Sequence, residues 1–133
     1  MRIFITFLWA IVLFVFTCSV NFHLLIKYHI VDFKFNPTPD WSELMKFDFQ
    51  WSSKEWILRK IGHLAGFFIL ALISSAFGKY KSAFYFSVIY AATTEILQLF
   101  FFRGGRIYDV INDSFGVLLA YLMCLIVFRR KSR

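Results

Sequence analysis

Cysteine and acidic residues are scarce in this chain of 133 residues. The two cysteines, Cys18 and Cys124, both lie within apolar stretches, so they give neither a disulfide framework nor a zinc-ligand spacing, and we expect two buried apolar side chains. Eight residues are Asp or Glu against fifteen Lys or Arg, which gives a formal net charge of +7. The basic residues lie between and after apolar runs. This placement favours contact with anionic lipid headgroups and argues against nucleic acid as a partner.

Polar residues in general are too few for a soluble domain of this length. Hydrophobic residues make up 59% of the chain and aromatic residues 22%. A small soluble domain leaves much of its surface in water and cannot bury so much apolar surface. The length leaves no room for a separate soluble catalytic unit. We therefore predict one membrane domain over residues 1–133, with membrane lipids as its surroundings.

Four stretches are apolar, apart from single polar positions, over about the 17–25 residues that a helix needs to cross a bilayer. They are residues 3–20, 61–78, 82–102 and 110–128. They are too long for core strands and do not alternate as barrel strands do. The sequence therefore predicts an all-α integral membrane protein, a bundle of four transmembrane helices with a long aromatic-rich outer loop over residues 21–60. The first stretch is interpreted as a retained helix, because it is long for a signal-peptide core and lacks a small-x-small cleavage site.

Basic residues in short flanks predict the orientation of the helices. Arg2 precedes the first helix, Lys79 and Lys81 lie between the second and third, and a cluster follows the fourth, namely Arg129, Arg130, Lys131 and Arg133. Four spans place these three flanks on one side of the membrane. We therefore expect a multi-pass protein with cytoplasmic N- and C-termini.

The predicted outer loop carries an aromatic pattern of its own. Its aromatic residues alternate with polar ones around a turn signal at residues 36–40, and they are Phe33, Phe35, Phe47, Phe49 and Trp51, with Trp41 and Trp56 suited to the headgroup level. Ser52 and Glu55 have capping-box spacing. The second helix is therefore expected to begin near Ser53, in the interface, before it enters the bilayer.

Ionisable residues at membrane depth carry the functional hypothesis, because each costs at least roughly 2.5–3.5 kcal/mol at a helix centre. Lys60 and His63 lie at the start of the second predicted helix, and Glu95 and Gln98 lie within the third. Asp109 and Asp113 lie at the start of the fourth, and Arg103 and Arg106 lie in the turn before it. With four spans, all of them meet near the outer leaflet. The predicted binding set is Lys60, His63, Glu95, Gln98, Arg103, Arg106, Asp109 and Asp113.

The pairing within this set allows two interpretations. Glu95 could pair with Arg106, Lys60 or a protonated His63 as structural glue, and the two aspartates could simply favour a helix N-terminus. The cost of a lone carboxylate at this depth instead favours one coupled cluster, in which Glu95, His63 and one arginine meet and Asp109 orients that arginine.

A metal site would be possible by ligand type from Glu95, Asp109, Asp113 and His63. No spacing of the HExxH kind supports it, so neither a metal nor a cofactor is predicted. Small residues at Gly62-x-x-x-Gly66 and Gly116-x-x-x-Ala120 predict close helix contacts.

The polar positions form a recognisable string. Arg59-Lys60-x-x-His63, then Glu95-x-x-Gln98, then Arg103-Gly104-Gly105-Arg106-x-x-Asp109-x-x-x-Asp113-x-x-Gly116 resembles the VanZ family of bacterial membrane proteins, over roughly residues 60–121. Many members have Pro-Gly-Arg before the last helix, so either arginine of this turn could be the family arginine. The resemblance implies a small four- or five-helix protein of the bacterial plasma membrane, linked to teicoplanin-type glycopeptide resistance.

Three functions compete on this basis. The first is a non-enzymatic cell-envelope protein whose outer polar cluster binds or masks a lipid-linked wall precursor or a lipoglycopeptide. The second is a small intramembrane enzyme acting on an envelope lipid, with Glu95 as general base assisted by His63 or Asp109. The third is a transporter or channel subunit with Glu95 as a gating carboxylate, although four helices are few and no inverted repeat is visible. Neither the ligand nor the oligomeric state follows from the sequence.

Overall fold

The chain folds into four long helices and two short ones. The computed structural model describes residues 1–131, and the side chains of all of these except Phe22 and residues 128–131. The elements are α1 (Arg2–Cys18), α2 (Phe22–Tyr28), the 3-10 helix η1 (Trp41–Met45), α3 (Lys54–Ser74), α4 (Ser82–Phe100) and α5 (Ile107–Lys131). Residues 1–131 contain no strand, so the all-α prediction is confirmed. Of the predicted basic tail, the side chains of residues 129–131 and the whole of Arg133 lie outside the described residues.

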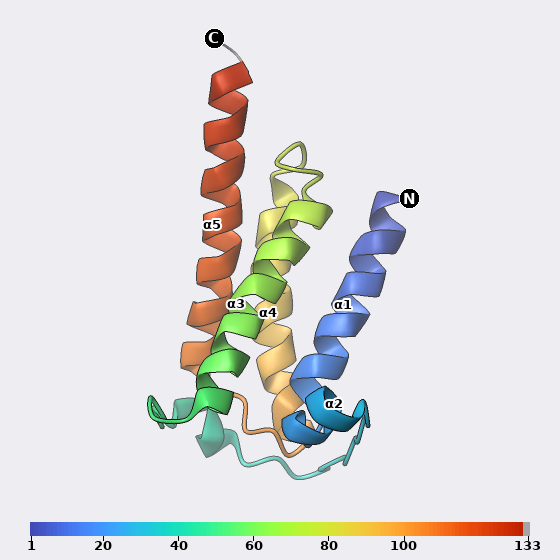
Figure 1. Ribbon diagram of the computed structural model, residues 1–133, viewed down its shortest axis with the longest axis vertical. Helices are drawn as coiled ribbons and strands as arrows, with labels where there is room; N and C mark the ends of the chain where they lie inside the picture. The colour runs from blue at the N-terminus through green and yellow to red at the C-terminus, as the bar shows by residue number, and fades with distance from the viewer. Residues whose placement is uncertain (132–133) are drawn as a thin grey trace.

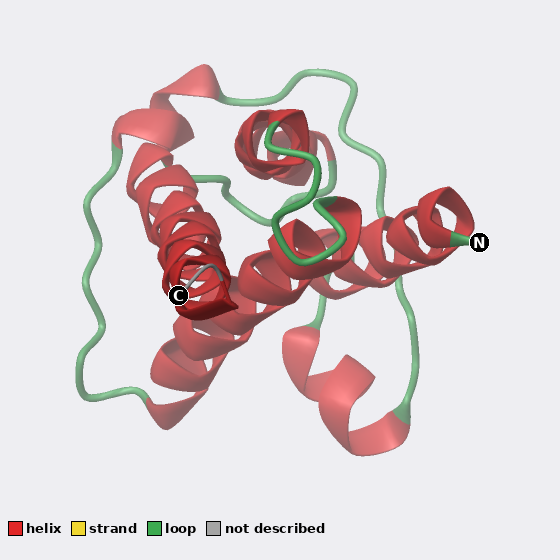
Figure 2. Cartoon of the chain, turned by 90° about the horizontal axis from the view of Figure 1, so that it is seen from above, coloured by secondary structure: helices red, strands yellow, loops and turns green. Residues whose placement is uncertain are grey.

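The four long helices run along the long axis of the molecule (Figure 1). The N-terminus, the turn after α3 and the end of α5 lie at one end, which we call the terminal end. α2, η1 and the connection between α4 and α5 lie at the other, which we call the loop end. α3 packs against α1, α4 and α5. From above, the chain between α2 and α3 passes around the outside of the bundle (Figure 2).

Three of the four predicted spans are confirmed by length and composition. They are Lys54–Ser74, Ser82–Phe100 and Ile107–Val127. α1 is apolar but has 17 residues. At about 1.5 Å per residue it is about 26 Å long, slightly less than the roughly 30 Å of a bilayer's hydrocarbon core. A fourth span therefore stays a prediction.

The second predicted helix begins near Ser53, as expected, but ends earlier than predicted. α3 begins after Ser53, whose side chain accepts the backbone N–H of Trp56 at 3.3 Å, so the cap lies one residue beyond Ser52 of the predicted capping box. α3 ends at Ser74, earlier than the predicted residue 78. Ala76 and Phe77 adopt left-handed backbone angles, with φ of 48° and 55°, and a helix cannot continue through them.

The aromatic alternation in the loop does not become a hairpin. Phe33 and Phe35 instead pack against the end of α4, each within 6.2 Å of the Phe101 ring centre. Phe47 and Phe49 lie 6.0 and 5.1 Å from the ring of Tyr108 at the start of α5. An isolated two-stranded hairpin is marginally stable, whereas these rings gain aromatic contacts on the helix ends. The loop is thus fastened across the loop end of the bundle.

Small residues allow close helix contacts at two of the three glycines where we expected them. A Cβ on Gly116 would lie 2.3 Å from the carbonyl oxygen of Leu64, and one on Gly66 would lie 2.5 Å from Cδ2 of Leu13. A Cβ on Gly62 would meet nothing within 4 Å, so the expected contact there is wrong. Cys18 and Cys124 are buried, as expected.

Candidate functional site

The eight predicted site residues gather at the loop end, where α3, α4 and α5 meet. α3 supplies Lys60 and His63, α4 supplies Glu95 and Gln98, and α5 supplies Asp109 and Asp113. The chain between α4 and α5 supplies the two arginines. Residues far apart in the sequence therefore share one site.

A buried triad of His63, Glu95 and Asp113 lies at the centre of this site. Nδ1 of His63 is 3.1 Å from Oδ2 of Asp113 and 3.8 Å from Oε1 of Glu95. Both carboxyl groups are fully buried. Gln98 Nε2 donates to Oε1 of Glu95 at 3.0 Å. Two carboxyl groups face one imidazole, so ionisation of both would leave net negative charge in the interior even with a protonated His63. Burial of that charge favours an additional proton or a bound cation.

The expected ion pair between Glu95 and an arginine side chain is wrong. Oε2 of Glu95 accepts the backbone N–H of Arg106 at 2.9 Å instead. Gly105 permits this approach, since a Cβ there would lie 1.8 Å from the backbone oxygen of Glu95. The guanidinium of Arg106 points to the loop, where Nε and Nη2 form a bidentate pair with Asp48 at 2.8 and 2.9 Å and Nη1 binds Glu43 at 2.6 Å. The Arg106 guanidinium thus binds the two loop carboxylates of Asp48 and Glu43 and not the interior carboxylate of Glu95.

Arg103 does not reach the triad either. Its Nε and Nη1 donate to the carbonyl oxygens of Thr17 and Val20, both at 3.2 Å. These groups lie at the end of α1, where helix carbonyls lack intrahelical partners. Asp109 forms an ion pair with Lys60 across α3 and α5, so its predicted role of orienting an arginine is also wrong.

The possible metal ligands divide into two groups. His63, Glu95 and Asp113 each offer one ligand atom, and these atoms lie within 4.8 Å of one another. Asp109 is not in this group. An imidazole and two carboxylates suit a divalent cation by donor type, although the 3.1 Å contact between His63 and Asp113 is also that of a hydrogen bond.

A small pocket, here called the polar pocket, opens next to the triad. It has a volume of about 40 Å³. Its lining contains His63, four basic residues and two aspartates, namely Arg59, Lys60, Arg103, Arg106, Asp48 and Asp109. Glu95 and Asp113 do not line it, so His63 stands between the pocket and the two buried carboxylates. A pocket of this size holds a group of a few heavy atoms at most.

Ion pairs close the pocket on the loop side. The Arg106 guanidinium lowers the pKa of Asp48 to about 2. Hydrogen bonds from Lys46 and then Arg106 lower the pKa of Glu43, and the same loop carboxylates raise that of Arg106. All three groups are therefore charged throughout the neutral range.

Sequence reasoning missed several residues of this site. Glu43 and Asp48 are separated from Arg106 by 63 and 58 positions, and nothing in their local sequence pointed to it. Gly105 was predicted only as part of the motif, and its close contact with Glu95 was missed. The pattern that could have revealed this contact is the Gly104-Gly105 pair shortly before a helix, because paired glycines mark a backbone that approaches another element closely.

Comparison with known proteins supports the membrane assignment. The family model described as VanZ/LLP1 matches residues 3–128. The chain is 36% identical over 125 residues to the uncharacterized membrane protein YwnJ of Bacillus subtilis (strain 168), covering 92% of this chain and 89% of that protein. No solved structure matches. The matched segment takes in the polar string and nearly all of the four long helices. The chain belongs to the VanZ/LLP1 family of membrane proteins.

Proposed function

We propose that this protein is a cell-envelope protein that binds the anionic headgroup of a lipid-linked ligand in the polar pocket, and that it contributes to glycopeptide resistance by holding or masking that ligand. One observation carries the proposal: four basic side chains converge on one small pocket at one end of a membrane bundle. Basic groups around a small cavity suit an oxyanion such as phosphate.

The pattern of paired and unpaired charges around the pocket supports an anionic ligand. Lys60 is paired with Asp109, and Arg106 with Glu43 and Asp48. Arg59 and Arg103 make no ion pair with any side chain in the described part of the chain. Two guanidinium groups are therefore left to attract an anion, while His63 separates them from the buried carboxylates.

We further propose that α1 is a fourth span, that both termini are cytoplasmic and that the polar pocket faces outward in a bacterial plasma membrane. Seven basic residues and no acidic ones occur at the first position of α1, in the turn after α3 and beyond residue 128. The other eight basic residues share the loop-end half with all eight acidic residues. This bias follows the positive-inside rule.

Teicoplanin susceptibility of an expressing host provides the functional test. Arg59→Glu reverses a charge in the pocket, whereas Lys54→Glu reverses one on the exposed first turn of the same helix, outside the pocket. We expect wild type and Lys54→Glu to raise the inhibitory concentration of teicoplanin equally and Arg59→Glu to abolish the increase, at equal amounts of protein in the membrane. Equal protection by the two variants would exclude the pocket as the site.

A small intramembrane enzyme acting on an envelope lipid is the second candidate, and the buried triad favours it. A carboxylate that orients an imidazole beside a second carboxylate is an arrangement used in general acid–base catalysis. In this alternative Glu95 is the base and His63 assists it, positioned by Asp113. Asp109, the other predicted assistant, pairs with Lys60. Glu95→Gln keeps the side-chain shape. With water as the co-reactant, purified wild-type protein would hydrolyse a polyprenyl phosphate to polyprenol and inorganic phosphate, and Glu95→Gln would not. An unchanged lipid with both would exclude this hydrolysis.

A further inference from the structure

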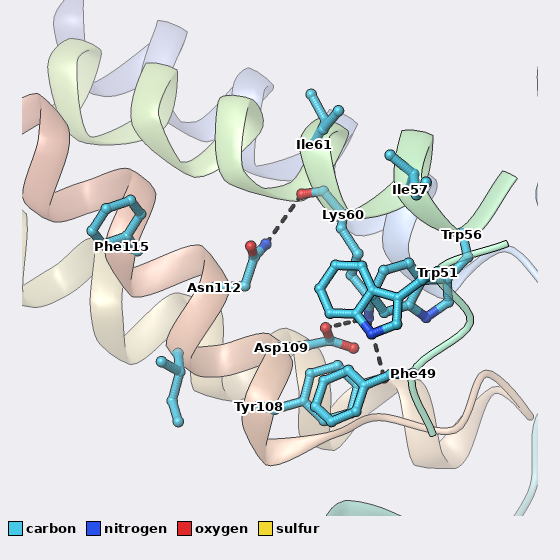
Figure 3. Close-up of a pocket in the computed structure, with 11 residues that line it drawn as sticks. Phe49, Trp51, Trp56, Ile57, Lys60, Ile61, Tyr108, Asp109, Asn112 and Phe115 are labelled. Atoms are coloured by element: carbon cyan, nitrogen blue, oxygen red, sulfur yellow. Dashed lines mark hydrogen bonds and ion pairs between the residues drawn. The ribbon is translucent and has the colours of Figure 1, made fainter. Parts of the chain in front are cut away.

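A second and larger cavity adjoins the polar pocket. This aromatic groove lies between α3 and α5 and has a volume of about 470 Å³, within the usual range of ligand sites. Figure 3 shows the aromatic side chains of Phe49, Trp51 and Tyr108 together at one end, where the loop meets the two helices. The loop thus closes one end of the groove.

The two cavities share a wall. Trp56, Lys60, Tyr108 and Asp109 line both of them. Nζ of Lys60 lies 4.5 Å from the ring centre of Tyr108 and 5.2 Å from that of Trp56, as well as in its ion pair with Asp109. A ligand that occupies both cavities would therefore pass a positive charge held by aromatic rings.

The side walls of the groove are apolar and open to lipid. Ile57 and Ile61 lie one turn apart on α3, and Ile111 and Phe115 lie one turn apart on α5. All four are exposed, within helices that are long and apolar enough to span the membrane. The groove therefore continues from the headgroup level into the hydrocarbon region.

We propose that the aromatic groove binds the hydrocarbon tail of a membrane lipid whose phosphate head occupies the polar pocket. This inference rests on the proposed function, because the head site is the same pocket. It adds the ligand class, a lipid phosphate rather than a soluble anion. A tail that moves from bilayer to groove leaves one apolar medium for another, so the groove contributes packing and orientation more than hydrophobic free energy.

The test uses the full chain purified in detergent and two probes, a long-chain polyprenyl phosphate and inorganic phosphate. Ile111→Trp fills the groove. Ile89→Trp is its control, because Ile89 on α4 is 64% exposed against 65% for Ile111 and does not line the groove. Arg59→Ala removes a charge from the polar pocket. Native mass spectrometry measures bound lipid, and calorimetry measures bound phosphate.

We expect Ile111→Trp to weaken lipid phosphate binding at least about fivefold, corresponding to about 1 kcal/mol, without affecting inorganic phosphate. Ile89→Trp should change neither, and Arg59→Ala should weaken both. If Ile111→Trp melts earlier than Ile89→Trp, Ile61→Trp from the opposite wall takes its place.

Two outcomes overturn the tail site alone. Equal lipid binding by the groove variant and Ile89→Trp is one, and equal affinity of the wild type for both probes is the other. In either case the phosphate response to Arg59→Ala would still support the polar pocket. Binding of both probes that does not depend on Arg59 would instead overturn the proposed function.

Discussion

The carboxylate of Glu95 is held by three groups of different chemistry. Gln98 supplies a side-chain amide, His63 an imidazole, and Arg106 only its backbone N–H. Truncating the Arg106 side chain leaves that backbone donor in place. The Arg106 side chain and the Glu95 carboxylate therefore belong to the same sequence motif but bind different partners.

A double-mutant cycle tests this separation. Arg106→Ala and Asp48→Ala should be coupled by about 0.5–1 kcal/mol, because their bidentate ion pair is partly exposed. Arg106→Ala and Glu95→Gln should be nearly additive. Thermal unfolding of the purified variants measures both couplings. A larger coupling between Arg106 and Glu95 would mean that the guanidinium reaches the interior carboxylate.

The loop ion pairs predict a particular dependence on pH. Arg106 lowers the pKa of Asp48 from 3.8 to about 2, so the folded state favours the ionised carboxylate. The resulting stability is fully present above about pH 4 and disappears as the pH falls towards 2. The difference in melting temperature between wild type and Asp48→Asn should therefore be constant from pH 5 to 8 and shrink below pH 4.

Asp48→Asn keeps the size of the side chain, so it serves as its own steric control in this series. A difference that stays constant down to pH 2 would show that Asp48 is not ion-paired in the folded protein.

Among the helices, α1 is attached along its whole length. Trp9 Nε1 donates to the carbonyl of Gly66 at 2.9 Å, and the Tyr90 hydroxyl donates to that of Ala10 at 2.6 Å. Near the two ends of the helix, Arg2 binds the carbonyl of Ser74 and Arg103 binds carbonyls at the end of α1. These side-chain donors use backbone acceptors on neighbouring elements. They explain how a helix slightly shorter than the others is held in the bundle.

Helix contacts predict unequal costs for three glycine substitutions. Gly116→Ala should destabilise by about 3 kcal/mol, because its Cβ would meet the backbone of Leu64, which cannot move away alone. Gly66→Ala should cost less, because the flexible end of Leu13 can shift. Gly62→Ala should be neutral or slightly stabilising, because the site is open and Ala is the better helix former.

The melting temperature in detergent measures this series, with Gly62→Ala as the matched control. Equal melting of the Gly62 and Gly116 variants would contradict the close crossing of α3 and α5.

The whole molecule is electrostatically asymmetric. Between residues 3 and 128, outside the turn after α3, acidic and basic residues are equal in number, so the net charge of +7 comes from Arg2, from that turn and from the sequence beyond residue 128. A positive terminal end suits the anionic cytoplasmic leaflet. The mixed charges at the loop end instead pair with one another, as in the ion pairs of Arg106.

Reporter fusions test the orientation that this asymmetry predicts. A reporter active only in the cytoplasm should be active after Arg133, and a reporter active only outside should be active when inserted at residues 36–40. The opposite pattern would place the polar pocket at the inner leaflet, and a cytoplasmic signal at both positions would mean that α1 does not span.

Most of the fold, and the gathering of eight polar residues at one end of the bundle, could be predicted from the sequence. Long apolar runs specify membrane helices, because lipid accepts backbone only when its hydrogen bonds are made within the segment. Helical spacing then placed Lys60 with His63, Glu95 with Gln98, and Asp109 with Asp113. Helix ends were less predictable: α3 stops at Ser74 because of left-handed residues that are not glycine, and the apolar pattern alone does not reveal them.

The sequence by itself determined that this protein is a helical membrane protein and that the ionisable residues within its apolar helices collect towards one end, because hydropathy and charge act residue by residue. Only the tertiary structure decided which partner each charge takes. Arg106 lies within reach of Glu95, Glu43 and Asp48, and its choice depends on a glycine that brings backbone rather than side chain to Glu95. The groove beside the pocket is likewise closed at one end because a distant aromatic loop folds back over α3 and α5. The ion pairs of Lys60 with Asp109 and of Arg106 with Asp48 join residues more than forty positions apart, and no local pattern encodes them.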